Sequence, residues 1–86
     1  MPEISRFFGI IIRMSYDDHP PPHIHVEYQG NKAKIDFRGN VLAGDLCSPT
    51  ALRLVREWID LHGADLEHDW ALACEGKPLE YVTPLE

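Results

Sequence analysis

The sequence predicts a single α+β domain, in which a small antiparallel β-meander of three or four strands carries two C-terminal helices packed on one face. Two patterns indicate this fold class: apolar residues recur with a strand period in the first half of the chain and at helical spacing in the second half. The length agrees, because 86 residues with 44% hydrophobic and 26% charged side chains suit one small globular domain. Residues 1–86 are therefore treated as one domain.

Four segments have the residue pattern of β-strands. The apolar, β-branched run Phe7–Met14 predicts the first strand, covered on most of both faces. A loop stiffened by Pro20–Pro22 then leads into His23–Tyr28 and Lys32–Phe37, two alternating segments that predict a β-hairpin. Val41–Ala43 is expected to form a short fourth strand.

The turn residues and the apolar pattern predict the register between the two strands of the hairpin. Residues 29–31 supply Gly and Asn, which tolerate positive φ. With a two- or four-residue turn and both apolar sets on one face, Val26 is expected opposite Ile35. The same register places His25 beside Asp36 on the other face.

The second half of the chain predicts two helices. Ser48 and Pro49 form a strong helix start, with a hydroxyl at the N-cap and proline at the first helical position. Gly63 is expected to end this helix, and Asp65 to cap a second, shorter one. Residues 79–86 are expected to be extended and to add an edge strand.

Charge and composition narrow the class of protein. The net charge of −6 lies wholly in residues 41–86, which hold nine acidic and three basic side chains. This balance argues against nucleic-acid binding by the chain alone. No apolar run approaches the roughly 20 residues of a membrane span. No secretory signal pattern is evident either, so we expect a cytoplasmic protein whose Cys47 and Cys74 are free thiols.

Histidines cluster around the proline-rich loop and form the candidate site. His23 and His25 lie two residues apart on a strand, so their side chains point the same way and could bind one Zn²⁺ or another divalent ion. His19 is the further candidate metal ligand, and Asp17–Asp18 stand just before it. His23, His25 and Asp36 are the candidate catalytic residues, with Asp36 orienting His25 or making it a general base. The alternative is that these side chains form only a polar or partner-contacting face.

Several segments together resemble a family of short bacterial proteins known as domain of unknown function 4160. They are Met1–Ser5, Phe8–Ile12, Asp18–Val26 and the helix Ala51–His62, and the His-x-Pro-Pro-His-x-His stretch of residues 19–25 is the most specific. The resemblance implies no established activity. Such proteins are often encoded beside another short family, an arrangement that looks like a toxin–antitoxin pair.

Two functions follow as expectations. The first is a protein-interaction module that binds a small partner protein or forms a homo-oligomer, as one component of a toxin–antitoxin-like pair. The second is a small metal- or histidine-dependent hydrolase, such as a nuclease-like toxin, that works through His23, His25 and Asp36. The sequence leaves open whether the protein is an enzyme.

Overall fold

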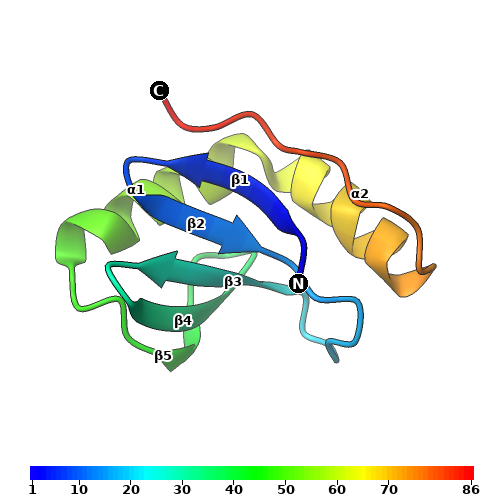
Figure 1. Ribbon diagram of the computed structural model, residues 1–86, viewed down its shortest axis with the longest axis horizontal. Coiled ribbons are helices and arrows are strands. Elements are labelled where there is room, and N and C mark those ends of the chain that lie inside the picture. Colours follow the sequence, from blue (N-terminus) through cyan, green and yellow to red (C-terminus); the bar gives the residue numbers. More distant parts are fainter.

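All 86 residues are described by a computed structural model, in which five strands precede two helices and an extended tail (Figure 1). The strands are β1 (Glu3–Phe7), β2 (Ile10–Arg13), β3 (His23–Tyr28), β4 (Asn31–Asp36) and β5 (Val41–Gly44). The helices are α1 (Pro49–Leu61) and α2 (Gly63–Cys74). The strands form one antiparallel sheet in chain order, β1-β2-β3-β4-β5. The α+β meander is confirmed, but it has five strands and not three or four.

The additional strand is β1, which is formed mainly by residues ahead of the apolar run Phe7–Met14; the run itself supplies the end of β1, a turn and β2, and is not one strand. Phe8 and Gly9 both have positive φ, 51° and 77°, and their two-residue turn reverses the chain between β1 and β2. Phe7 and Ile10 flank the turn and are buried, whereas 60% of Phe8 is exposed at its tip. The apolar run therefore contains a turn followed by the half-buried strand β2, and it is not a single strand covered on both faces.

The β3–β4 hairpin has the predicted faces but a different register. Gln29 and Gly30, with φ of 50° and 80°, form a two-residue turn. Val26 consequently lies opposite Ala33, and the predicted pairing with Ile35 is wrong. A shift of two residues leaves every side chain on its own face, so the apolar pattern is satisfied equally by both registers.

The core lies between one face of the sheet and the helices. In Figure 1, α1 passes behind the sheet, and α2 lies toward the end of the sheet at which β3 begins. The fully buried sheet and α1 side chains belong to one apolar cluster that includes Ile10, Ile12, Ile24, Ile35, Val55, Trp58 and Ile59. Neither helix is long and apolar enough to cross a membrane.

The start of the first helix agrees with the prediction from the sequence, whereas the junction between the two helices differs from it. Ser48 caps α1 as predicted, because its Oγ accepts a 3.1 Å hydrogen bond from the Ala51 amide. His62 alone separates the two helices, and Gly63 begins α2. The expected cap Asp65 therefore lies in the first turn of α2, where its carboxylate contacts His62 Nδ1 at 3.2 Å.

The C-terminal tail covers the outer edge of the sheet beside β1 (Figure 1). Val82 donates its amide to the Ile4 carbonyl at 2.7 Å, and Ser5 Oγ donates to the Val82 carbonyl at 3.0 Å. Trp58 Nε1 donates to the Thr83 carbonyl at 2.9 Å. The tail is extended, as predicted, but it forms no sixth strand.

Candidate metal centre

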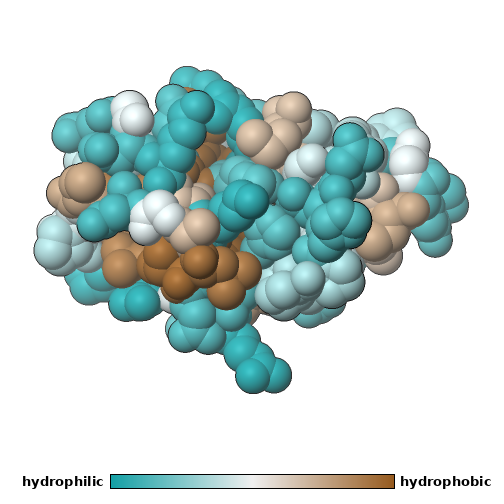
Figure 2. Space-filling model, turned by 90° about the horizontal axis from the view of Figure 1, so that it is seen from below, coloured by the Kyte–Doolittle hydropathy of each residue, from teal (hydrophilic) through white to brown (hydrophobic).

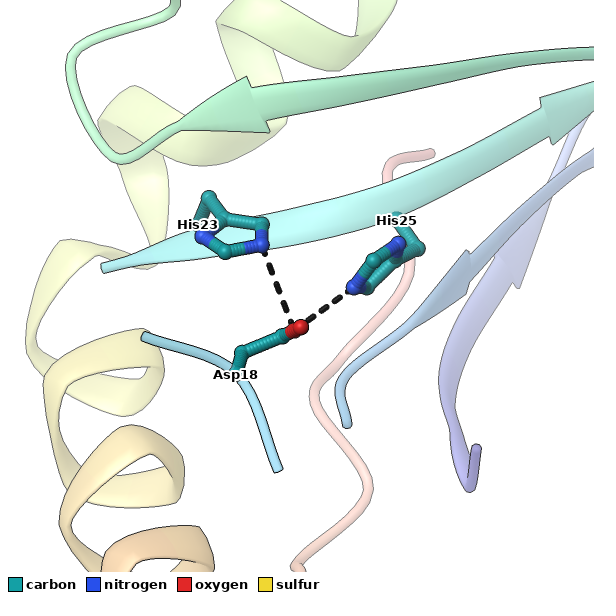
Figure 3. A group of neighbouring side chains, drawn as sticks. All are labelled: Asp18, His23 and His25. Atoms are coloured by element: carbon teal, nitrogen blue, oxygen red, sulfur yellow. Dashed lines mark hydrogen bonds and ion pairs between the residues drawn. The ribbon is translucent and has the colours of Figure 1, made fainter. Parts of the chain in front are cut away.

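Three side chains that can bind a metal ion meet at the start of β3: Asp18, His23 and His25 (Figure 3). Their ligand atoms all lie within 4.8 Å of one another. The loop before β3 supplies Asp18, whose carboxylate points between the two imidazole rings. His23 and His25 share a side of the strand, as their spacing predicts, because alternate residues point to the same face.

His23 has one ring nitrogen with a fixed partner and one without. The ring is almost fully buried, and Nδ1 lies 2.8 Å from the Pro21 carbonyl oxygen. A carbonyl oxygen can only accept, so Nδ1 carries the proton and, in the neutral ring, Nε2 presents a lone pair. Nε2 is buried and has no hydrogen-bond partner, although Asp18 Oδ2 lies 3.2 Å away.

His25 contacts the same carboxylate oxygen more closely. Its Nε2 lies 2.6 Å from Asp18 Oδ2, a charge-assisted hydrogen-bond distance, and the ring is only partly buried. The centroids of the His23 and His25 rings are 5.1 Å apart. One carboxylate oxygen thus lies between two imidazole nitrogens that come from the same face of one strand.

This arrangement favours positive charge at its centre. The Nε2 lone pair of neutral His23 and the carboxylate of Asp18 are both electron-rich and repel each other at 3.2 Å. Either a proton on Nε2 or a metal ion between the ligands relieves that repulsion. Imidazole and carboxylate are also an established ligand set for Zn²⁺, with bonds of about 2.0–2.2 Å.

Aromatic side chains from the rest of the fold hold His23 in place. The ring of Trp70, on α2, lies 5.8 Å from the His23 ring between centroids. Phe37 packs edge-on against Trp70, with centroids 6.1 Å apart and an interplanar angle of 88°. The position of His23 therefore depends on the docking of α2 as well as on β3.

Asp36 lies outside this cluster, and its predicted pairing with His25 is wrong. In the observed register Asp36 is opposite His23, and His25 is opposite Lys34. The Asp36 carboxylate instead accepts hydrogen bonds from the Arg38 and Asn40 amides and from the Asn40 side chain. Burial raises the pKa of Asp36, but these hydrogen bonds outweigh it and hold the pKa below its usual value. Asp36 therefore stabilises the turn before β5.

His19 is also outside the cluster. It is exposed in the proline-rich loop, and the grouped ligand atoms belong to Asp18, His23 and His25 alone. The neighbouring Asp18 thus occupies the place that the sequence interpretation gave to His19.

Sequence reasoning missed the roles of two residues at this site. Asp18 was visible only as an acidic residue near the histidines, because its approach depends on the path of the loop through residues 19–22. Trp70 has the helical spacing of a core residue, and nothing local predicts its contact with His23. The usable signal for Asp18 is its closeness in the sequence to His23 and His25, since metal-binding histidines need a neighbouring group to hold their orientation.

Comparison with known proteins gives the family. A family model described as "Domain of unknown function (DUF4160)" matches residues 9–71, well over half of the chain, and the chain therefore belongs to this family. The matched range contains Asp18, His23, His25 and Trp70. No curated protein and no solved structure matches the chain.

Proposed function

We propose that this member of the DUF4160 family is a small metal-dependent hydrolase whose divalent ion, Zn²⁺ or a related metal, is held by Asp18, His23 and His25. One observation carries the proposal: the buried Nε2 of His23 has no hydrogen-bond partner and faces a carboxylate. A metal ion accepts the lone pair and neutralises the carboxylate at once. Protonation of Nε2 would instead give a buried imidazolium–carboxylate pair, whose attraction must offset the desolvation of both charges.

The ligand set favours a hydrolytic site over a structural one. Two histidines and one carboxylate leave a fourth position for water, whereas structural zinc sites are closed by four protein ligands. A bound ion supplies a water whose pKa falls to about 7. Within the chain, the Pro21 carbonyl fixes the tautomer of His23 at 2.8 Å, which keeps Nε2 free to bind.

The test is metal binding by the intact protein. We expect Zn²⁺ to bind one to one with micromolar or tighter affinity, and more weakly as the pH falls and the imidazoles are protonated. The double variant His23→Gln/His25→Gln should lose this binding and keep the fold. The matched control His19→Gln/His68→Gln removes two exposed histidines and should bind as the wild type does.

Activity is then measured with the zinc-loaded protein on p-nitrophenyl esters of acetate, of phosphate and of the phosphate diester. Cleavage of at least one ester by the wild type, lost in His23→Gln/His25→Gln, supports the proposal. Absence of zinc binding, zinc binding that survives the double substitution, or no cleavage of any ester contradicts it.

We propose as a second candidate a protein-interaction module, because β5 is an open sheet edge. All four residues of β5 are exposed, and Val41 and Leu42 retain 40% and 44% of their accessible surface. Figure 2 views the molecule from the β5 side and shows an apolar patch there, bordered by polar surface. An apolar strand with unpaired backbone groups favours pairing with another strand.

The occupant that fits this edge is a second copy of the chain. The tail covers the β1 edge, so each molecule has one open edge, and pairing across a two-fold axis closes as a dimer. The same edge would receive a strand of a small partner protein, such as the other half of a toxin–antitoxin-like pair.

Analytical sedimentation tests whether the open β5 edge mediates dimerisation. We expect a concentration-dependent dimer that Leu42→Lys abolishes, because a charge on the edge strand opposes strand addition. Leu61→Lys, which alters an exposed leucine on α1, is the control and should leave the dimer intact. A wild type that stays monomeric at high concentration contradicts the dimer, as does a dimer that survives Leu42→Lys.

A further inference from the structure

We infer that a hollow on the open face of the sheet, beside His25, binds a phosphate monoester, the substrate class of the hydrolase proposed above on which this inference rests. The hollow has a volume of about 270 Å³ and is lined by residues of β2, β3, β4 and β5. It lies on the polar face of the strands, opposite the face on which the core packs. His25 is part of its wall.

Strand pairing places basic side chains on both sides of His25. Arg13 of β2 is its partner on one side, and Lys34 of β4 is its partner on the other. Directly cross-strand residues have Cβ atoms about 4.5–5.5 Å apart, so these three side chains form one row. Lys32 lies two residues along β4 from Lys34, on the same face.

The charge of the hollow is opposite to that of the chain. Its charged side chains are Arg13, Lys32, Lys34 and Glu27, which sum to +2 with His25 neutral, whereas the whole chain carries −6. Glu27 is already engaged by Arg13, with Oε1 3.0 Å from Nη1. Neither lysine takes part in an ion pair, and both are exposed. Two ammonium groups are therefore free to bind an anion.

A phosphate monoester matches this charge better than a diester or a carboxylate. Its second pKa is near 6, so it carries between about −1.5 and −2 at neutral pH, whereas the other two carry a single charge. Its three terminal oxygens also accept several hydrogen bonds at once.

His25 links this hollow to the proposed metal centre. His25 lines the hollow, while its Nε2 contacts Asp18 at 2.6 Å. A phosphoryl group held by Lys32 and Lys34 would thus lie next to the proposed site of water activation. The reaction is R–O–PO₃²⁻ + H₂O → R–OH + HPO₄²⁻, in which water oxygen bonds to phosphorus, the P–O(R) bond breaks and the leaving alkoxide takes a proton from the water.

The test separates anion binding from metal binding. Inorganic phosphate is titrated into the metal-free protein, and p-nitrophenyl phosphate hydrolysis is followed with the zinc-loaded protein. Lys32→Gln/Lys34→Gln should weaken phosphate binding and raise KM at least about tenfold, because hydrogen bonds to charged groups contribute factors of that order. Zinc affinity in this variant should stay within about twofold of the wild type, since neither lysine is a ligand. The control Arg53→Gln/Lys77→Gln removes two positive charges outside the hollow and should change neither quantity.

The outcomes are distinct for the two proposals. Phosphate binding that depends on Lys32 and Lys34 in a protein that binds no zinc supports the hollow and contradicts the hydrolase. Zinc-dependent cleavage of the acetate ester or the diester but not the monoester supports the hydrolase and overturns this inference. Unchanged phosphate binding and KM in Lys32→Gln/Lys34→Gln overturn it as well.

Discussion

Replacement of Trp70 by alanine should weaken metal binding although Trp70 is not a ligand. Its ring contacts the His23 ring at 5.8 Å and the Phe37 ring at 6.1 Å between centroids. Aromatic contacts of this kind contribute about 0.5–1.5 kcal/mol each beyond their buried area, so Trp70→Ala removes about 1–3 kcal/mol of packing around the ligand. Loss of a group that orients a metal ligand typically lowers metal affinity by about 10–100-fold, and we expect a decrease in that range.

Calorimetric titration of Zn²⁺ is the assay, combined with thermal unfolding of the metal-free protein. Trp70→Phe keeps an aromatic ring against His23 and should retain most of the affinity. Val55→Ala provides the control for stability, because it opens a cavity under α1 and leaves the cluster unchanged. If Trp70→Ala lowers the unfolding temperature but binds zinc as tightly as the wild type, then β3 and the Pro21 carbonyl position His23 without help from α2, and the reasoning is refuted.

Two further predictions concern stability. Trp58→Ala should destabilise the fold by about 3–5 kcal/mol, because the side chain is fully buried and donates to the Thr83 carbonyl; a thermal melt that barely changes would contradict the placement of α1. Burial raises the pKa of Asp69, whose Oδ1 accepts from the Glu80 amide. The pKa of the Asp69 carboxyl is higher in the folded protein than in the unfolded chain. Its contribution to the free energy of unfolding is therefore fully present below the pKa of the unfolded chain and is lost as the pH rises through the pKa of the folded protein. Asp69→Asn should remove that loss, so the variant gains stability over the wild type as the pH rises; a constant difference across the pH series would contradict the assignment.

The sequence predicts those parts of the fold that depend on apolar periodicity along the strands and helices and on helix-capping residues. Ser48 caps the start of α1 as predicted, because a side-chain cap is a local signal. The hairpin register depends on the length of the turn, and apolar alternation does not change when a strand slips by two residues. The positive φ of Phe8 was not visible either, since an aromatic residue seldom adopts it.

At the candidate site, too, the features that depend on neighbouring residues could be predicted, whereas those that depend on strand register or on the path of a loop could not. His23 and His25 could be grouped from their spacing, because alternate strand residues share a face. Asp36 was misplaced by the register error, and its hydrogen bonds to the Arg38 and Asn40 amides are local turn contacts. Asp18 joins the histidines through a loop whose path the residue pattern does not specify.

The alternation of β3 explains why the site and the fold can be altered separately. Ile24 and Val26 are buried in the core and fix the strand by their packing, with 0% and 2% of their surface exposed. His23 and His25 occupy the intervening positions and point to the other face, where Asp18 reaches them. Substitutions that shorten Ile24 or Val26 would move the strand and the ligands with it. Substitutions of the histidines by glutamine leave the apolar face unchanged, but His23 is itself buried against Trp70, so a loss of function is assigned to the cluster where the variant's thermal unfolding matches that of the wild type.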